Sequence, residues 1–392
     1  MKFDLNKFLI SCSFVLDFIE IDILDNITNH CKKVGYISLK IGDSFHLSEK
    51  EKFNLLVFAI LHDIGGVENK KKVSKGELEQ AKEHCIIGER SIRNFPFFFD
   101  QYKNIILYHH ENHDGSGFFQ KEKDEIPLFS QIISIADYCE LIYSSDKSRE
   151  EIILEIKKEQ GKKFSEDMVK KFIEISQQES FWLNLKDEFI LSAVEAESPK
   201  FNLDYSYQQL NEVTTLFSDI IDSKSHFTKR HSAGLSKKAE IMAEFYNFSP
   251  EKKYKFIIAA NLHDLGKLAI SNSILDKPGK LTKEEFGKMK AHTFYTRKVL
   301  ERIDGFDEIT EWAANHHEKL EGSGYPYAFD KDDLDFPSQI MMALDIYQAL
   351  REDRPYRSTM SHAKAMGILN TMVSAGKLNS KIVSDIAKVF KS

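Results

Sequence analysis

The chain has 392 residues, of which 42% are hydrophobic and 29% are charged. This is the balance of a globular protein with enough apolar material for two or three domains. The formal net charge is −7, from 54 basic and 61 acidic residues. Because there is no basic excess, we expect neither a nucleic acid polymer nor a membrane as a partner. An anionic substrate would have to be attracted locally, by metal ions and a few basic side chains.

The sequence predicts neither a signal peptide nor a membrane span. Acidic residues interrupt the apolar segment at residues 3–25, and the longest uninterrupted apolar run, residues 55–61, is too short to cross a bilayer. We therefore expect a cytoplasmic protein with reduced thiols. Its cysteines should act as small buried hydrophobes, and those that follow a histidine should point away from it. They are Cys12, Cys31, Cys85 and Cys139.

The periodicity is helical nearly throughout, because amphipathic stretches dominate and only 8 prolines and 18 glycines interrupt them. Residues 3–25 predict one or two lead-in helices. A long helical stretch, a buried apolar run at residues 53–61 and two further apolar runs at residues 105–108 and 132–136 follow. Histidines and aspartates stand where these patterns begin or end: His30, His62, Asp63, His84, His109, His110 and Asp137.

The second half of the chain repeats this order. Positions 30 and 62 in the first half and positions 231 and 263 in the second are both 32 residues apart. The clearest difference lies between positions 62 and 84, which are 22 residues apart, and positions 263 and 292, which are 29 apart. We interpret the pattern as an internal duplication with one change in loop length. The second set is His231, His263, Asp264, His292, His316, His317 and Asp345.

Each repeat ends in a further helical extension, at residues 149–176 and 364–391. The boundary between the repeats falls near Ser198-Pro199-Lys200, and residues 201–226 predict the lead-in helix of the second repeat. The sequence thus predicts an all-α fold with two tandem helical domains, residues 1–200 and residues 201–392.

Each repeat supplies five histidines and two aspartates, a donor set that suits transition metals better than calcium or a thiolate zinc site. Seven donors exceed what one tetrahedral ion needs, so we expect two divalent ions per site, with Asp264 as a bridge. Iron or manganese is expected first, and zinc, nickel or magnesium are the alternatives. Two such ions would activate water and clamp an in-line phosphoryl displacement. On a continuous helix, Lys267 would lie one turn after His263 and could meet an anionic oxygen.

The second repeat resembles the HD-GYP subgroup of the HD phosphohydrolase superfamily, bacterial phosphodiesterases that act on cyclic dinucleotides. The resemblance covers about residues 226–392. It rests on the following motifs: His263-Asp264-Leu265-Gly266-Lys267, Lys277-Pro278-Gly279-Lys280-Leu281-Thr282 ahead of His292, His316-His317-Glu318, Gly324-Tyr325-Pro326, Asp345, and Asp353-Arg354-Pro355-Tyr356-Arg357.

The resemblance implies metal ligation by the seven residues of the second set and a catalytic role for Asp264. It also implies a substrate-phosphate contact by Lys267. The substrate pocket would be shaped by Gly324, Tyr325, Pro326, Arg354 and Arg357.

Three positions depart from the family pattern in ways that affect the metal site. A glutamate that some members place four residues before the first histidine is Phe227 here and Asn26 in the first repeat, which favours two metals over three. An aspartate that often follows the Asp345 position by three residues is Gln348. This change would alter the hydrogen bonds that orient the metal ligands.

The first repeat resembles the same family less completely. All seven ligand positions are filled, but Gly66 replaces the lysine, Gly117-Phe118-Phe119 replaces the Gly-Tyr-Pro motif, and residues 145–149 replace the Asp-Arg-Pro-Tyr-Arg segment. A glycine cannot supply the charge of a lysine to a transition state. We therefore expect the second domain to be the catalyst. The first would be a metal-loaded structural or regulatory partner, or a second active site of different specificity.

The resemblance implies a phosphodiesterase that converts cyclic di-GMP to linear pGpG, with further cleavage to GMP left open. Two alternatives remain: a 3′,3′-cyclic GMP-AMP phosphodiesterase, and a metal-bound module that senses nucleotides with little turnover. The presence of Lys267 and Arg354 in the second repeat favours an enzyme. The sequence leaves open the metal, the regulating signal and whether the protein is a homodimer.

Overall fold

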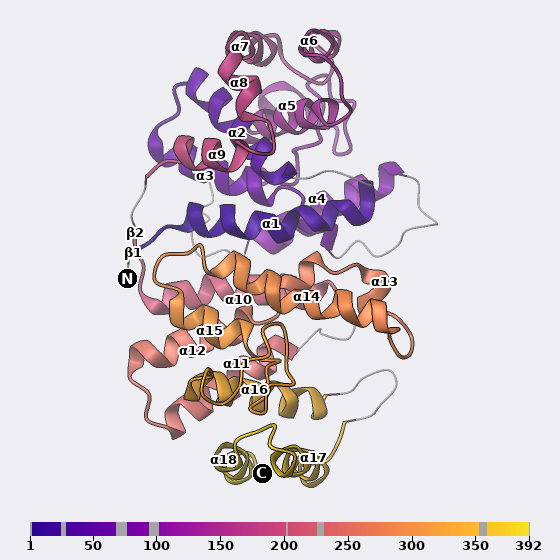
Figure 1. The fold of residues 1–392 in the computed structure, drawn as a ribbon. Helices are drawn as coiled ribbons and strands as arrows, with labels where there is room; N and C mark the ends of the chain where they lie inside the picture. The colour runs from indigo at the N-terminus through magenta and orange to yellow at the C-terminus, as the bar shows by residue number, and fades with distance from the viewer. Residues whose placement is uncertain are drawn as a thin grey trace. The chain divides into compact units, whose positions relative to one another are not determined.

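The computed structural model describes residues 2–24, 29–67, 77–93, 102–200, 203–225, 231–352 and 359–391. The chain divides into two compact units, an N-terminal unit (Lys2–Leu203) and a C-terminal unit (Asp204–Ser392). Helices make up both units (Figure 1). The strands in the described ranges are two short ones, β1 (Lys2–Phe3) and β2 (Leu203–Asp204), which pair with each other. The predicted all-α class is confirmed.

The N-terminal unit is built around α2 (His30–Ser44), in which every residue from His30 to Leu39 is buried. This helix packs against α3, α5 and α9. The other elements of the unit are α1 (Leu5–Leu24), α3 (Glu49–Leu61), η1 (Ile64–Val67), α4 (Glu77–Ile92), η3 (Lys123–Glu125), α5 (Leu128–Tyr143), α6 (Arg149–Lys158), α7 (Glu166–Ser176), α8 (Glu179–Asn184) and α9 (Ile190–Glu197).

In the C-terminal unit, α12 (Pro250–Leu262) packs against α10, α11 and α15. It begins with a proline at its first turn, and the Ser249 hydroxyl accepts a hydrogen bond from the backbone of Lys252. The other elements are α10 (Tyr207–Ser223), α11 (His231–Phe245), η4 (Leu265–Ala269), α13 (Asn272–Leu275), α14 (Lys283–Leu300), α15 (Asp307–Ala314), α16 (Phe336–Leu350), α17 (His362–Ser374) and α18 (Ser380–Val389).

The order of elements repeats between the units, so that α2, α3, η1, α4 and α5 correspond to α11, α12, η4, α14 and α16. The segments before the paired histidines differ between the units. The C-terminal unit forms α15 just before its paired histidines, whereas residues 103–110 of the N-terminal unit form turns. Asn104 there has a φ of 65°, in the left-handed region that interrupts an α-helix.

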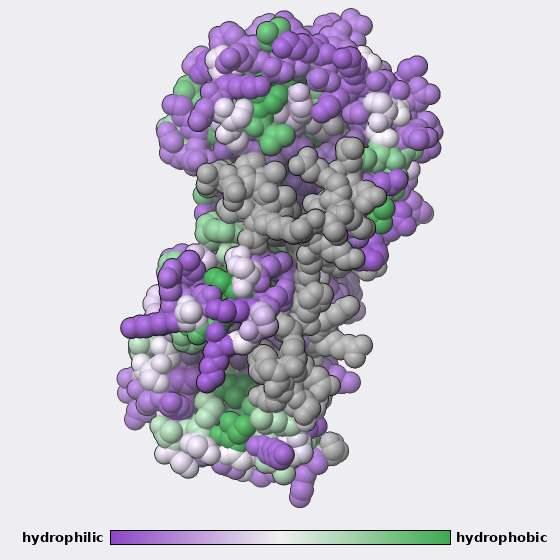
Figure 2. Space-filling model, turned by 90° about the vertical axis from the view of Figure 1, so that its right-hand side faces the viewer, coloured by the Kyte–Doolittle hydropathy of each residue, from purple (hydrophilic) through white to green (hydrophobic). Residues whose placement is uncertain are grey.

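Hydrophilic residues cover most of the described surface on the face that Figure 2 shows. The apolar residues of the helices form the interior; Phe58 and Phe172 of the N-terminal unit and Phe256 and Trp312 of the C-terminal unit are almost completely buried. Within the described ranges, each helix is too short or too polar to cross a bilayer.

Candidate metal centre

The first histidine of each predicted set is placed at the start of a helix by a carboxylate from the preceding helix. In the C-terminal unit, Asp222 of α10 accepts hydrogen bonds from the backbone N–H (3.1 Å) and the hydroxyl (2.7 Å) of Ser232. In the N-terminal unit, Asp17 of α1 accepts from the backbone N–H of Cys31 at 2.9 Å. An anionic acceptor at a helix N-terminus is favourable because it satisfies an unpaired donor and opposes the helix dipole.

The His263-Asp264 pair lies in the turn between α12 and η4. The helix ends at Leu262, so the prediction that Lys267 lies one α-helical turn after His263 is wrong. The 3₁₀ segment brings Lys267 back toward the turn, where its backbone N–H donates to the carbonyl of Asp264 at 2.8 Å. Its ammonium lies 2.5 Å from Oδ2 of the same residue.

A glycine lets this turn approach the helix that carries the lone histidine. A Cβ atom on Gly266 would lie 2.0 Å from the carbonyl oxygen of His292, and one on Gly65 would lie 2.0 Å from that of His84. Any side chain would push the turn away from the helix, so the glycine in each His-Asp motif is a packing requirement.

The seven predicted residues of the C-terminal unit come together in one cluster. Two triads within it have donor atoms that all lie within 4.8 Å of one another: His231, His263 and Asp264 form one, and His292, His316 and His317 form the other.

Two carboxylates connect these triads. Asp264 Oδ2 lies 3.0 Å from Nε2 of His263, and its Oδ1 lies 3.5 Å from Nε2 of His292. Asp345 Oδ1 lies 3.0 Å from Nε2 of His231, and its Oδ2 lies 3.8 Å from Nδ1 of His317. Asp264 is thus placed as a bridging ligand would be, and Asp345 also reaches both triads.

The chemistry of the donors fits a bound cation. His292 and His316 each donate the Nδ1–H to a backbone carbonyl at 2.6 Å, of Met289 and Ala313 respectively. Each Nε2 therefore carries a lone pair, and the two Nε2 atoms lie 3.4 Å apart with no proton to share. Burial lowers the pKa of His292 to about 4 and that of His316 to about 3, so both rings are neutral near pH 7.

Two more atoms in the cluster lack a hydrogen bond. Nε2 of His263 and Oδ1 of Asp264 are buried, and neither has a hydrogen-bond partner among the described residues. Such a buried polar atom costs about 1–3 kcal/mol when it is unpaired. A metal ion coordinated by these atoms removes that cost, so the residues present fit the expected metal.

His231 differs from the other histidines because both of its ring nitrogens face carboxylates. Its Nε2 lies 3.0 Å from Asp345, and its Nδ1 donates to Glu352 at 3.0 Å. Burial lowers the pKa of His231, but the hydrogen bonds to the two carboxylates outweigh burial and raise the pKa to about 10. The sequence did not predict a role for Glu352.

The seven predicted residues of the N-terminal unit also cluster. One group contains His30, His62 and Asp63, and a second contains His84, Cys85, His109 and His110. The Nε2 atoms are 3.2 Å apart in the pair His30 and His62 and in the pair His84 and His109. Asp63 reaches both groups, at 3.4 Å from Nε2 of His62 and 3.3 Å from Nε2 of His84. Asp137 lies 3.6 Å from Nε2 of His30.

The prediction that cysteines next to a histidine point away from it is wrong for Cys85. Its Sγ atom lies 3.7 Å from Nε2 of His84 and 3.9 Å from Nδ1 of His109. Burial raises the pKa of the thiol, but the neighbouring His109 and His84 outweigh burial and lower the pKa to about 7. None of the four cysteines forms a disulfide, and all four are buried.

Two family models described as HD domain match the chain, one over residues 27–142 and the other over residues 215–382. Each match contains one of the two clusters. The chain is a tandem HD-domain protein. The predicted resemblance is therefore confirmed, and it extends to both halves.

Relatives of the tandem HD protein carry names that describe cyclic dinucleotide phosphodiesterases. The 3′3′-cGAMP-specific phosphodiesterase 1 of Vibrio cholerae is 28% identical over 375 residues, which are 92% of this chain and 86% of that one. A probable cyclic di-GMP phosphodiesterase of the same organism is 38% identical over 129 residues, 31% of this chain and 29% of that one. The crystal structure of a cyclic GMP-AMP specific phosphodiesterase of V. cholerae matches with a TM-score of 0.71 and 25% identity, and covers 100% of this chain and 98% of that one.

The predicted Gly-Tyr-Pro loop lies beside the C-terminal cluster of the tandem HD protein. The Tyr325 ring lies 4.9 Å from the ring of His317, centroid to centroid, and its backbone N–H donates to the carbonyl of His317 at 3.3 Å. The loop is anchored by buried Glu318, whose carboxylate accepts from the backbone N–H groups of Tyr327 (2.8 Å) and Phe329 (3.1 Å). The sequence showed Glu318 as part of a motif but did not predict this anchoring role.

Several predicted positions lie outside the described residues. They are Asn26, Phe227 and the segment 353–358, which contains the predicted pocket residues Arg354 and Arg357.

The N-terminal unit keeps the loop anchor, but a glycine stands at the position of Lys267. Glu111 accepts from the backbone N–H groups of Phe119 (2.8 Å) and Lys121 (2.7 Å), as Glu318 does in the other unit. Gly66 occupies the backbone place of Lys267, because its N–H donates to the carbonyl of Asp63 at 2.8 Å. Among the residues that the structure describes, Asp63 therefore has no counterpart to the close contact between Lys267 and Asp264.

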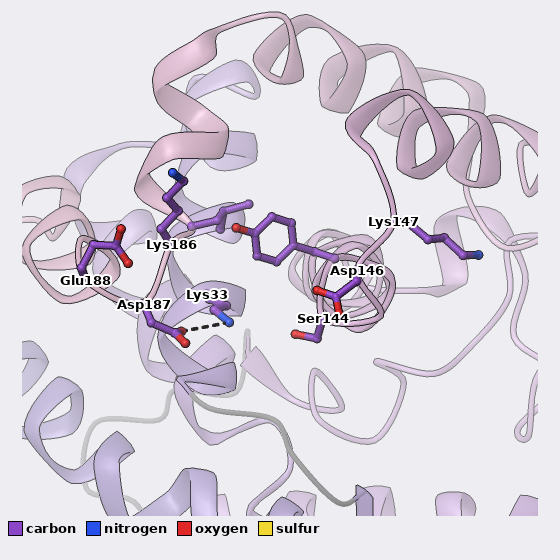
Figure 3. Close-up of a pocket in the computed structure, with 9 residues that line it drawn as sticks. Lys33, Ser144, Asp146, Lys147, Lys186, Asp187 and Glu188 are labelled. Atoms are coloured by element: carbon purple, nitrogen blue, oxygen red, sulfur yellow. Dashed lines mark ion pairs between the residues drawn. The ribbon is translucent and has the colours of Figure 1, made fainter.

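A cavity of about 480 Å³ lies near the first histidine of the N-terminal cluster (Figure 3). Lys33 in its wall pairs with Asp187 at 3.2 Å and with Glu140 at 3.6 Å, and Glu140 accepts from Nδ1 of His30 at 2.6 Å. The replacement segment 145–149 contributes Asp146 and Lys147 to the wall. Acidic and basic side chains balance there, whereas the corresponding predicted segment of the second repeat, residues 353–357, has two arginines and one aspartate.

Proposed function

We propose that the tandem HD protein hydrolyses a 3′–5′ phosphodiester bond of a cyclic dinucleotide at the C-terminal cluster, with 3′3′-cGAMP as its preferred substrate. The observation that carries this proposal is the set of inward-facing donors around Asp264, which includes two histidine lone pairs 3.4 Å apart and two buried atoms without hydrogen bonds. Both support a bound pair of cations, which would activate water for phosphodiester hydrolysis.

The ligands of that pair would be the two triads together with Asp345, and Asp264 would bridge them. A bound metal pair supplies Lewis acidity toward phosphate oxygens and a nucleophile derived from water at neutral pH. Iron or manganese is the expected pair, because the C-terminal donors are nitrogens and oxygens only. The identity of the metal stays a prediction.

The side chains around the cluster have separate tasks. The Lys267 ammonium is held beside Asp264 and is free to turn toward a phosphate oxygen once that carboxylate ligates metal. The Tyr325 ring, against His317, forms an apolar wall where a base or ribose can lie. Charge developing on the phosphate in the transition state would be stabilised by the ammonium, which makes Lys267 a catalytic residue.

The preference for 3′3′-cGAMP rests on how the relatives align. Two relatives named for 3′3′-cGAMP align with 92% and 66% of this chain, and a third aligns with 40% of it. Five relatives named for cyclic di-GMP align with between 28% and 48% of it. A substrate preference that depends on both halves would be shared by proteins that have both halves. Cyclic di-GMP is the second candidate, because relatives named for it align with a smaller part of this chain.

The N-terminal cluster is proposed as a structural or regulatory metal centre. It has the ligands, but Gly66 stands at the position of Lys267, and the wall of its neighbouring cavity carries balanced charge. A cytoplasmic location and the homodimer remain predictions from the sequence.

The test is anaerobic purification followed by chromatography of the products formed from 3′3′-cGAMP and from cyclic di-GMP at equal concentrations. We expect linear product from both, with the larger kcat/KM for 3′3′-cGAMP. A larger kcat/KM for cyclic di-GMP would reverse the substrate order while leaving the activity in place. Metal-loaded protein that cuts neither substrate would contradict the proposed function.

A further inference from the structure

The two centres differ at the residue that follows the lone histidine, which is Cys85 in the N-terminal unit and Thr293 in the C-terminal unit. The Thr293 hydroxyl donates to the carbonyl of Lys290 at 3.0 Å and is thus bound within its own helix. The Cys85 sulfur instead lies 3.7 Å from Nε2 of His84 and 3.9 Å from Nδ1 of His109, the nitrogen that donates to the carbonyl of Ile106 at 2.6 Å. The C-terminal cluster therefore contains only nitrogen and oxygen donors, whereas the N-terminal cluster also has sulfur.

The spacing of the donors fits one ion with mixed ligands. A tetrahedral zinc-type ion with metal–sulfur bonds of about 2.3 Å and metal–nitrogen bonds of about 2.0 Å separates sulfur from nitrogen by about 3.5 Å and two nitrogens by about 3.3 Å. The observed separations are 3.7 Å between Sγ of Cys85 and Nε2 of His84, and 3.2 Å between the Nε2 atoms of His84 and His109. The donor atoms of these residues and of His110 all lie within 4.8 Å of one another.

Asp63 adds an independent observation at the same place. Its Oδ1 atom is buried and has no hydrogen-bond partner among the described residues. It lies 3.3 Å from Nε2 of His84 and 3.5 Å from Nε2 of His109, which again is the spacing of two ligands on one ion. Cys85 is therefore not an isolated cysteine but one of several donors that converge.

We propose that Cys85 is a thiolate ligand of the ion held by His84 and His109, and that this position of the N-terminal centre is selective for zinc. On binding, the sulfur–metal bond forms and the thiol proton leaves to the solvent, with no change of oxidation state. Thiolate favours zinc over iron(II) or manganese(II), while the nitrogen and oxygen donors of the C-terminal centre retain the latter ions.

A sulfur ligand also changes what the N-terminal ion can do. With His84, Cys85, His109 and either His110 or Asp63, the ion would have four protein ligands, as structural zinc ions do, and no open position for a reactant. This explains why the N-terminal unit keeps all its ligands although Gly66 replaces the lysine of the other unit. The inference does not depend on whether the C-terminal centre hydrolyses a cyclic dinucleotide.

The test uses full-length protein loaded with cobalt(II) and compares near-ultraviolet absorption between variants. We expect the wild type to show a sulfur-to-cobalt charge-transfer band and Cys85→Thr, which copies the residue of the other unit, to lose it. Two controls should keep the band: Cys139→Ser, which removes another buried thiol, and His263→Ala, which damages only the C-terminal centre. A wild type without the band, or a band that survives in Cys85→Thr, would overturn the proposal.

Zinc X-ray absorption of the wild type gives a second measurement in case Cys85→Thr does not fold. We expect a sulfur shell at about 2.3 Å, and a zinc spectrum with nitrogen and oxygen shells alone would also overturn the proposal. In folded Cys85→Thr, checked by circular dichroism, bound zinc should fall by one equivalent per chain while iron or manganese content stays unchanged. Because these readouts are spectroscopic and analytical, their failure is distinct from any loss of hydrolysis.

Discussion

Glu352 accepts a hydrogen bond from Nδ1 of His231 at 3.0 Å. In the N-terminal unit the same ring nitrogen of His30 donates to Glu140 at 2.6 Å. The two glutamates do not occupy equivalent positions: Glu140 is three residues after the last aspartate of its set, and Glu352 is seven residues after its own. One helical turn separates these positions, and a carboxylate placed at either of them reaches the same imidazole.

In each unit, the other of these two helix positions holds a residue that donates a hydrogen bond to the glutamate. Ser144, at the position of Glu352, donates to Glu140 at 2.6 Å. Gln348, at the position of Glu140, donates through its side-chain amide to Glu352. Both units therefore orient the first histidine with a carboxylate, buried in Glu140 and partly exposed in Glu352, although the residue that supplies it differs in position by one helical turn.

Replacing this carboxylate should weaken metal binding without removing a ligand. We expect Glu352→Gln to lower metal affinity at the C-terminal centre by about 10–100-fold, because the partner that fixes the ring and raises its basicity is lost. The double change Gln348→Glu with Glu352→Ser reproduces the N-terminal arrangement and should recover most of the affinity. Competition with a metal-selective chelator measures both, and unchanged affinity in Glu352→Gln would refute the positioning role.

Removing the Lys267 ammonium should slow turnover while metal stays bound. We expect Lys267→Gly, which copies Gly66 of the other unit, to reduce kcat by about 10²–10³-fold, as loss of one transition-state donor does. Metal content should remain that of the wild type, and Lys267→Arg should retain part of the activity because it retains the charge. Steady-state kinetics with metal analysis separates these outcomes; a lysine that acts only in folding would lower metal content and activity together.

Metal affinity at the C-terminal centre should rise with pH. In metal-free protein His231 has a pKa of about 10, so it is protonated near pH 7 and must lose a proton to ligate. His292 and His316, with pKa values of about 4 and about 3, are already neutral and release none. One released proton gives an increase of about tenfold in apparent affinity for each pH unit from 7 to 9. Titration in two buffers of different ionisation enthalpy counts the protons, and a pH-independent affinity would contradict the assignment.

Loss of the loop anchor should affect substrate binding in one unit only. Glu318→Ala leaves two backbone N–H groups without their acceptor, at a cost of about 1–3 kcal/mol, and frees the loop that carries Tyr325. We expect a higher KM with metal content unchanged. The matched variant Glu111→Ala loosens the corresponding loop of the N-terminal unit and should leave KM unchanged. Equal effects of the two variants would place the substrate at both centres.

Much of the candidate site follows from the sequence because the ligands recur in one order. His30 and His231 begin helices, and His62 and His263 follow buried ones, as the apolar runs predict. Backbone geometry at the His-Asp turn could not be derived in this way, because the change from α12 to η4 depends on the close approach of Gly266 to α14. The periodicity of a sequence predicts which face of a helix is apolar, but it does not predict which helix packs against that face.

The side chains that the sequence did not identify depend on tertiary packing. Cys85 was expected to point away from the cluster, yet His109 comes from a separate segment and meets the sulfur there. The role of Glu352 was not predicted because the family pattern often has an aspartate at position 348, one helical turn earlier. A buried glutamate after each pair of histidines, Glu111 and Glu318, was the recurring signal that could have identified the loop anchors.

The most direct test of the central claim compares two matched variants, Asp264→Asn and Asp63→Asn, in anaerobic turnover of 3′3′-cGAMP. Each removes the charge of the carboxylate that lies between the two donor groups of its centre, while it keeps the size of the side chain. The proposed function predicts that Asp264→Asn loses hydrolysis and that Asp63→Asn keeps most of it. Full activity in Asp264→Asn together with loss in Asp63→Asn would contradict the assignment and move catalysis to the N-terminal centre.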